Sequence, residues 1–191
     1  MELTPIVDEQ EWQGARDALL VKEKELTHAR DALAAERRRM PRMLVEKEYE
    51  FEGPDGRVSL LDLFEGRRQL IIYRFFYEPG VSGWPEKGCP GCSMMADHIG
   101  PLSHLHAKDT SLVLISRAPL TKLLAFRDRM GWTLPWVSSE STTFNEDFRA
   151  TVDGEERQAI SVFLRDGSRV FHTWSTYARG EEPFMLTYGD G

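Results

Sequence analysis

The stretch LIIYRFFYEPGVSGWPEKGCPGCSMMADHI, residues 70–99, decides the fold. Residues 70–77 are an apolar and aromatic run of strand length, which is typical of a strand buried in the middle of a sheet. A loop rich in Gly and Pro follows over residues 78–88. The motif CPGC at residues 89–92 then begins a stretch with apolar residues at helical spacing. The segment therefore predicts a strand, a loop and a helix, with two thiols where the helix begins.

Downstream of the motif, strand and helix signals alternate. We expect a helix split at Gly100-Pro101, a buried strand over 112–115 and a helix from Pro119 to near Gly131. A short extended piece over 135–138 and a polar irregular segment over 139–158 follow. The last expected element is a hairpin of strands 160–165 and 168–174 around the turn Asp166-Gly167. The helix prediction from Pro119 rests on a proline at its start and a glycine at its end. The hairpin prediction rests on a two-residue turn between two alternating runs.

Upstream of residue 70, the sequence predicts a long helix and a hairpin. Residues 8–39 read as one helix, with Asp8 as N-cap and Glu11 three residues later. Its apolar stripe suits either a face packed on the domain or a seam between two subunits. Residues 48–52 and 58–60 suggest extended structure around a Gly-Pro-Asp-Gly turn, and 61–64 a short helix.

These elements together indicate an α/β fold, because a strand, helix, strand order closed by an antiparallel hairpin makes a mixed sheet with helices on both faces. We expect two parts: an N-terminal helical extension over residues 1–43 and the main domain over residues 44–191. A homodimer through the N-terminal helix is a further expectation.

Composition narrows the class of protein. The 191 residues contain 24 Lys and Arg against 31 Asp and Glu, a net charge of −7. This argues against a general nucleic-acid binder, which would carry a basic surface. No apolar run is long enough for a transmembrane helix, and the N-terminus has no pattern of a secretory signal. We therefore expect a cytoplasmic protein that binds neither nucleic acid nor membrane.

The two cysteines of the chain, Cys89 and Cys92, form a C-x-x-C motif. In a cytosolic protein such a pair indicates redox chemistry or half of a metal site. The metal alternative would recruit histidines at 98, 104 and 106, although 104 and 106 point to different sides of a continuous helix. A redox-derived fold with lost or changed activity is the third interpretation. We expect no metal and no dissociable cofactor, because a dithiol itself carries two electrons.

The order of the motif assigns a role to each residue. Cys89 lies at the start of the helix, where backbone N–H groups and the helix dipole favour a thiolate. It is therefore the candidate nucleophile, and Cys92, one turn further in, is the candidate resolving thiol. Pro90 fits the first turn of a helix. Gly91 allows close approach of a partner chain.

The sequence also resembles known families. Residues 51–64, FEGPDGRVSLLDLF, look like the opening of redoxin and alkyl hydroperoxide reductase-like domains. More specifically, the chain resembles a bacterial thioredoxin-like family of unknown function. The matching segments are EWQGARDALLVKEKELTHARDALAAERRRMP (11–41), GCPGCS (88–93), ISRAPL (115–120), RMGW (129–132), PWVSS (135–139), FNEDF (144–148), VFLRDG (162–167) and STYARG (175–180). This resemblance implies a thioredoxin-like mixed sheet flanked by helices, with an N-terminal helical extension.

The sequence departs from thioredoxins at several positions. Gly88 stands where a Trp usually precedes the first cysteine, and the motif reads Cys-Pro-Gly-Cys rather than Cys-Gly-Pro-Cys. The segment Arg157-Gln158-Ala159-Ile160 has no proline where thioredoxins carry a cis-proline facing the thiols. The peroxiredoxin pattern Thr-x-x-Cys is also absent, because Glu86 holds the Thr position.

The resulting functional expectation is a thioredoxin-like thiol–disulfide oxidoreductase that acts on a protein or small-molecule disulfide or peroxide and needs a separate reductase for recycling. The alternatives are a thiol peroxidase-like enzyme and a non-enzymatic scaffold with a metal-binding or assembly role. Arg117 follows a core strand, where ligand-facing residues often lie. Tyr177 and Arg179 follow the hairpin and are weaker candidates for a substrate pocket.

Overall fold

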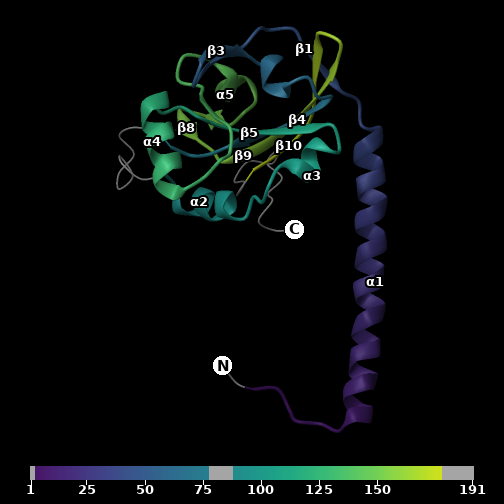
Figure 1. The fold of residues 1–191 in the computed structure, drawn as a ribbon. Coiled ribbons are helices and arrows are strands. Elements are labelled where there is room, and N and C mark those ends of the chain that lie inside the picture. The colour runs from purple at the N-terminus through teal and green to yellow at the C-terminus, as the bar shows by residue number, and fades with distance from the viewer. Residues whose placement is uncertain (1–2, 78–87, 178–191) are drawn as a thin grey trace. The chain divides into compact units, whose positions relative to one another are not determined.

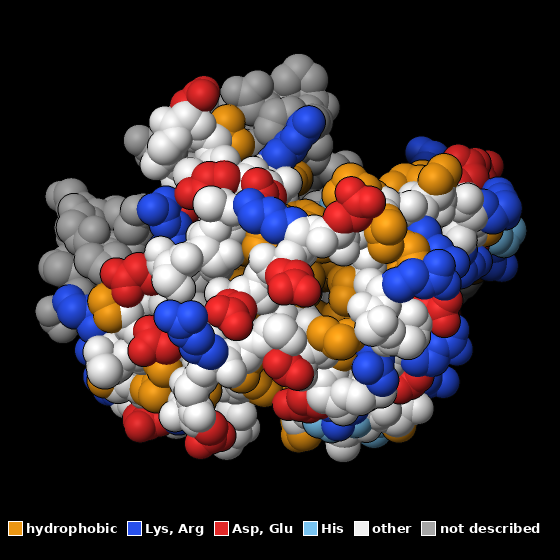
Figure 2. Space-filling model, turned by 90° about the horizontal axis from the view of Figure 1, so that it is seen from above, with side chains coloured by type: hydrophobic (Ala, Val, Ile, Leu, Met, Phe, Trp, Pro, Cys, Tyr) orange, Lys and Arg blue, Asp and Glu red, His pale blue; other side chains and the backbone are white. Residues whose placement is uncertain are grey.

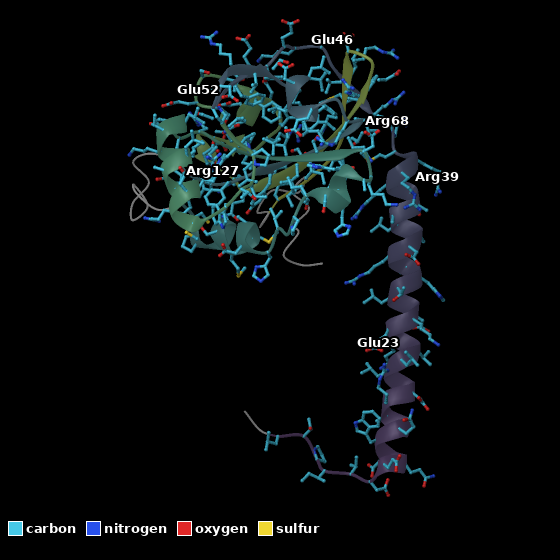
Figure 3. The ribbon with its side chains drawn as sticks, viewed as in Figure 1. Glu23, Arg39, Glu46, Glu52, Arg68 and Arg127 are labelled. Carbon is cyan, nitrogen blue, oxygen red and sulfur yellow. The ribbon has the colours of Figure 1, made fainter. Side chains whose placement is uncertain are left out.

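The computed structural model describes residues 3–77 and 88–177, and the chain divides into two compact units, Met1–Pro41 and Arg42–Gly191. The first unit consists mainly of helix α1, Glu9–Arg39, from which Glu23 and Arg39 project (Figure 3). Asp8 caps α1 by accepting the Glu11 N–H at 2.8 Å, so the predicted helix and its N-cap are confirmed. None of the residues of α1 is buried.

The second unit is built on an eight-stranded mixed sheet with the order β1-β10-β9-β4-β5-β6-β2-β3 (Figure 1). Its strands are β1 Met43–Val45, β2 Glu50–Gly53, β3 Gly56–Ser59, β4 Gln69–Arg74, β5 Thr110–Ser116, β6 Trp136–Ser138, β9 Ala159–Asp166 and β10 Arg169–Tyr177. β4, β5 and β6 are parallel, and the other pairings are antiparallel. A separate small ribbon pairs β7 Thr151–Val152 with β8 Glu155–Glu156.

Helical segments cover both faces of the sheet (Figure 1). They are η1 Asp62–Phe64, α2 Pro90–Asp97, α3 Ser103–His106, α4 Leu120–Met130 and α5 Phe144–Asp147. Along β4, Leu70 and Ile72 pack into a core with η1 and α5, whereas Tyr73 packs into a second core with α2 and α4. This alternation is the period of two expected of a strand. It makes the fold an α/β sheet with helices on both faces, as predicted.

Two sequence-based predictions need correction. The hairpin turn is Gly167-Ser168, not Asp166-Gly167, because Asp166 pairs with Arg169 across the strands. Gly167 has φ +61°, which suits the first central position of such a turn. The segment 139–158 is not irregular throughout, since it holds α5 and the β7–β8 ribbon. The loop predicted over 78–88 falls, except for Gly88, outside the described residues.

The surface is mixed in charge. In Figure 2, acidic and basic side chains are interspersed on the face shown, with hydrophobic side chains visible between them. Glu46, Glu52, Arg68 and Arg127 lie at the periphery of the second unit (Figure 3). Among the described residues, no helix combines the length and the apolar character needed to cross a membrane.

Candidate active site

The two cysteines lie at the N-terminus of α2, beyond the end of β4. Cys89 is the N-cap residue of α2, and Pro90 occupies its first turn, where the missing N–H removes no helical hydrogen bond. The Cys89 N–H donates to the Phe76 carbonyl at 3.1 Å, which ties the helix start to the chain leaving β4. The predicted placement of C-x-x-C between a central strand and a helix is therefore the observed one.

The Cys89 sulfur accepts hydrogen bonds from two directions. The Cys92 backbone N–H lies 3.4 Å from it, and Nε2 of Gln158 lies 2.7 Å from it. These donors and a side-chain hydrogen bond with Cys92, which is the largest cause, lower the pKa of Cys89 to about 6, against the opposing effect of burial. Cys89 is therefore largely a thiolate near neutral pH, the form that attacks disulfides.

Cys92 has the opposite character. Its side chain is fully buried, and burial is the main reason why the pKa of Cys92 is raised well above that of a free thiol, with the neighbouring Cys89 adding to the effect. The Phe76 N–H donates to its sulfur at 3.3 Å, and a side-chain hydrogen bond with Tyr73 acts to lower its pKa. The pair thus combines a reactive outer thiolate with a protonated inner thiol.

An aromatic cluster packs behind the motif. The Phe75 ring lies 4.7 Å from Trp136 and 5.9 Å from Trp132, measured between ring centroids. A Cβ on Gly88 would come within 2.4 Å of the Phe75 ring, so glycine is the residue that leaves room for Phe75. This explains why no Trp precedes Cys89. Trp136 is fully buried in this core, and the partly buried Trp132 packs against it.

Gln158 is the site residue that the sequence analysis did not single out. It stands directly before β9, in the segment where thioredoxins carry a cis-proline, and every peptide bond in the described part of the chain is trans. Its contact with Cys89 spans 69 positions of sequence, so no local pattern could reveal it. The absence of a proline was the only sequence signal at this place.

A buried charged cluster lies beside Gln158. The side chains of Arg74 and Glu156 are 3% and 4% exposed and form an ion pair at 3.4 Å. Asn145, which is fully buried, donates to Glu156 at 3.3 Å and accepts from Arg74. Burial is the main cause that lowers the pKa of Arg74 to about 10. Arg117 joins the cluster through an ion pair with Glu156 at 3.2 Å.

The remaining candidates are placed less centrally. Tyr177 packs in a small core with Ala150 and Ala159, and its hydroxyl donates to the Phe148 carbonyl at 3.2 Å, which is a packing role. Arg179 lies outside the described residues. A Cβ added to Gly91 would lie 3.9 Å from Cys89 Sγ and would be in contact with no other atom.

The metal site considered from the sequence does not match the geometry. Asp97, the last residue of α2, accepts from the Trp132 indole at 2.8 Å. Within residues 3–77 and 88–177, no three His, Cys, Asp or Glu side chains gather closely enough to hold a metal ion. The histidines at 98, 104 and 106 are therefore not assembled with the cysteines into a Cys2His2 set.

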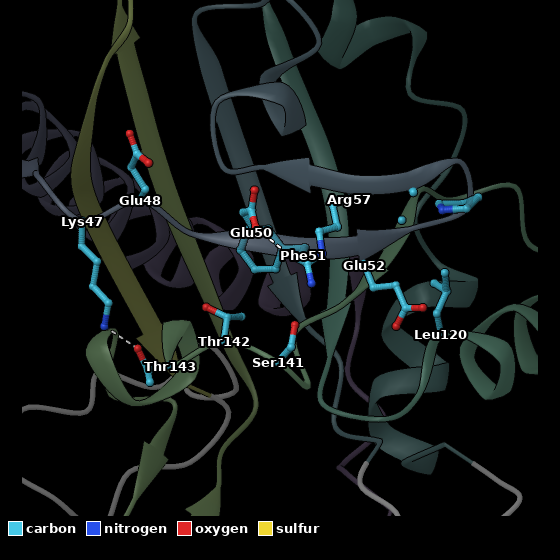
Figure 4. A pocket seen from close by; sticks show the side chains of 13 residues that line it. Lys47, Glu48, Glu50, Phe51, Glu52, Arg57, Leu120, Ser141, Thr142 and Thr143 are labelled. Carbon is cyan, nitrogen blue, oxygen red and sulfur yellow. Dashed lines mark hydrogen bonds and ion pairs between the residues drawn. The ribbon is translucent and has the colours of Figure 1, made fainter.

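A separate pocket lies away from the thiols. It has a volume of about 830 Å³ and lies along β2 and β3, with Lys47, Glu50 and Arg57 among its polar lining (Figure 4). Arg57 pairs with Glu50 at 3.2 Å across the hairpin. Neither cysteine lines this pocket. The candidate thiol site at the start of α2 is therefore separate from this pocket.

A mixed sheet whose central parallel strand leads into a helix that begins with C-x-x-C defines a thioredoxin-like protein. The family described as "Bacterial protein of unknown function (DUF899)" matches residues 1–189, so the chain belongs to that family. This confirms the resemblance read from the sequence. A comparison with curated proteins found no match.

Solved structures with the same fold include three bacterial redox proteins. Peroxiredoxin Q of Xanthomonas campestris is 16% identical, with a TM-score of 0.51 over 69% of this chain and 80% of its own. A cysteine-to-serine mutant of PrxQ from Xylella fastidiosa is 14% identical, with a TM-score of 0.51 over 70% and 80%. The bacterioferritin comigratory protein of X. campestris, studied for alkyl peroxide reduction, is 16% identical, with a TM-score of 0.50 over 69% and 81%. At these identities the likeness establishes the fold.

Proposed function

We propose that the chain is a thiol–disulfide oxidoreductase in which Cys89 is the nucleophile and Cys92 the resolving thiol. The observation that carries the proposal is the hydrogen-bonded Cys89 sulfur at the start of α2, with a pKa of about 6, next to a buried thiol whose pKa is raised. Two thiols with pKa values pushed apart in this way suit the two successive steps of disulfide exchange.

The proposed reaction has two steps. The Cys89 thiolate attacks one sulfur of a substrate disulfide, the S–S bond breaks, and the first substrate thiolate leaves. Cys92 then gives up its proton and attacks the Cys89 sulfur of the mixed disulfide, which expels the second substrate thiolate and leaves a Cys89–Cys92 disulfide. The substrate gains two electrons and the protein loses two. A dithiol reductant restores the pair, and the cytoplasm is the proposed compartment because it supplies such reductants.

The test is mass analysis of the whole protein equilibrated across dithiothreitol redox buffers, with zinc measured on the same sample. We expect a reversible loss of two hydrogen atoms in the wild type and none in Cys89→Ser or Cys92→Ser. Met94→Ser is the matched control, since Met94 is 60% exposed on the same helix and should titrate as the wild type does. Bound zinc that blocks the transition would favour a metal-binding scaffold.

A thiol peroxidase is the second candidate, favoured by the burial of the nucleophile. Cys89 is only 4% exposed, and a hydroperoxide reaches a covered sulfur more readily than a folded disulfide protein does. In that reaction the Cys89 thiolate attacks the outer peroxide oxygen, forming a sulfenic acid and an alcohol or water. Cys92 then displaces water and closes the disulfide. Rates of oxidation by hydrogen peroxide, cumene hydroperoxide and glutathione disulfide, compared at equal concentration, separate the two candidates.

A further inference from the structure

Gln158 makes a contact with Cys89 that specifies the state of the sulfur. Its Nε2 carries two N–H donors and no acceptor lone pair, so the 2.7 Å approach to Sγ requires the sulfur to accept. Hydrogen bonds to an ionised acceptor are about twice as strong as those between neutral groups. The amide therefore favours the anionic sulfur over the thiol.

We propose that Gln158 is a catalytic residue that holds the Cys89 sulfur in its reactive anionic form, and that the buried Arg74–Glu156 pair positions it. The inference rests on the dithiol function proposed above and adds to it the residue that replaces the missing proline. Gln158 touches the reacting atom, whereas Arg74 and Glu156 act through Gln158.

The backbone around Gln158 explains how it reaches the thiol. Ala159, the next residue, pairs with Arg74 at the end of β4. Two residues beyond Arg74, Phe76 contacts both cysteines through its backbone. Gln158 directly precedes β9, and the chain that leads to the cysteines follows β4. Because β4 and β9 are antiparallel neighbours, both segments lie at the same end of the sheet. A side chain of glutamine length bridges the two.

The segment before β9 is fixed by the charged cluster. Glu156 receives Arg74 at 3.4 Å and Arg117 at 3.2 Å, and it also accepts from Asn145 and Thr151. The next residue, Arg157, donates its backbone N–H to the Ala150 carbonyl at 2.6 Å. Two consecutive anchors therefore precede Gln158, and they restrict its backbone without a proline ring.

The donors that act on the Cys89 sulfur carry no formal charge. They are the Cys92 side chain, the N–H groups of Cys92 and Gly91, and the Gln158 amide. Arg74 and Glu156, the charged groups on the neighbouring strand and ribbon, are paired with each other. If Glu156 acted on Cys89 through its charge alone, its removal would make the thiolate easier to form. If it acts by positioning Gln158, its removal makes the thiolate harder to form.

The experiment measures the pH dependence of Cys89 alkylation by iodoacetamide. All proteins carry Cys92→Ser, so that Cys89 is the single thiol and a hydroxyl still stands beside it. We expect Gln158→Met to raise the midpoint of the profile above its starting value. Gln13→Met is the matched control, because Gln13 is exposed on α1 and the same substitution there should leave the midpoint unchanged.

The midpoint separates the proposed role from simple shielding. If Gln158 only covers the sulfur, Gln158→Met, whose side chain is of similar size, leaves the midpoint in place, and this result overturns the proposal. Gln158→Glu keeps the size of the side chain and places a carboxylate on the sulfur. Gln158→Glu should raise the midpoint as well, so the role of Gln158 can still be tested if one of the two variants does not fold. Unchanged midpoints in both folded variants overturn the proposal.

A double-mutant cycle tests the positioning role. Glu156→Gln should raise the midpoint, and it should add nothing further in the presence of Gln158→Met, because it acts through the same side chain. A lowered midpoint, or full additivity, overturns that role. Alkylation needs no disulfide, so an unshifted midpoint rejects the Gln158 assignment alone. The dithiol function fails separately, if the two-hydrogen transition is absent.

Discussion

Helices α1 and α2 both begin with a side chain that accepts a backbone N–H, but the two caps have different surroundings. Asp8 accepts the Glu11 N–H at 2.8 Å at the start of α1, and Cys89 accepts the Cys92 N–H at 3.4 Å at the start of α2. The first cap stands in an exposed helix without a buried residue. The second is 4% exposed and receives a further donor, Gln158. The Cys89 cap thus differs from the Asp8 cap by a second hydrogen-bond donor, which lowers the pKa of its sulfur against the opposing effect of burial.

The largest expected difference between the two regions concerns their ion pairs. Glu156→Leu leaves Arg74 buried without its carboxylate and should lower the free energy of unfolding by about 3–5 kcal/mol. Glu23→Leu on α1 breaks the Arg16–Glu23 pair, whose side chains are 39% and 51% exposed, and should cost about 0–1 kcal/mol. Urea denaturation of both variants measures the contrast. Equal losses would contradict it, and Arg74→Met added to Glu156→Leu should restore part of the lost stability.

The next effect is the pH dependence of the reduced protein. The folded pKa of Cys89 is about 6 against 9.0 for the free group, so the folded state binds fewer protons than the unfolded chain between these values. The stability contributed by Cys89 is present above pH 9 and is lost as pH falls through 6. Relative to Cys89→Ser, the reduced wild type should gain roughly 2–4 kcal/mol over this range.

Denaturation at a series of pH values, with a reductant present, checks this prediction. Met94→Ser serves as the control, and its curve should parallel the wild type. If the wild type and Cys89→Ser also gave parallel curves, Cys89 would not be a stabilised thiolate. Cys92 affects the free energy of unfolding only at alkaline pH. There its thiol ionises in the unfolded chain but not in the folded protein, where its pKa is raised, and this destabilises the folded state.

A smaller effect comes from adding one methyl group in each region. Gly88→Ala places a Cβ 2.4 Å from the Phe75 ring and should cost about 1–3 kcal/mol through overpacking. Gly14→Ala meets nothing within 4 Å and should stabilise α1 by about 0.5–1 kcal/mol. Melting curves followed by circular dichroism measure both. A Gly88→Ala variant as stable as the wild type would show that the aromatic cluster rearranges at little cost in free energy.

The smallest effect is the loss of the α1 cap. Asp8→Ala removes the acceptor for the Glu11 N–H and should cost α1 about 1 kcal/mol, seen as reduced helix content at elevated temperature. Asp8→Asn keeps an acceptor and should behave as the wild type. The alkylation profile of Cys89 should be the same in both variants. A shifted profile would contradict the view that the two helix starts are independent.

The sequence predicted the elements with strong local signals. β4 was placed in the middle of the sheet by its apolar run, and α4 was bounded by Pro119 and Gly131, which are its N-cap and C-cap in the structure. The thiols at the start of α2 followed from the same reasoning. The hairpin was right, but its turn was one residue off, because Asp166-Gly167 and Gly167-Ser168 are both acceptable two-residue turns.

The missed features depend on contacts between distant residues. Asn145 and Glu156 were read as part of a polar irregular segment, yet both side chains are buried and contact Arg74. Gln158 gave no signal of its own, since a lone glutamine before a strand is ordinary. Tyr73 was read as part of an apolar strand, and only the packing of α2 brings Cys92 to it.

The aromatic cluster also equips the protein with an optical probe. Trp136 lies in the same buried core as both cysteines. Its ring is 4.7 Å from that of Phe75, and the next residue, Phe76, contacts the backbone of Cys89 and the sulfur of Cys92. A disulfide is a strong quencher of indole emission at short range, and a thiol is a weaker one. Oxidation of the pair should therefore dim the intrinsic fluorescence, so that its electron transfer can be followed in real time without a label.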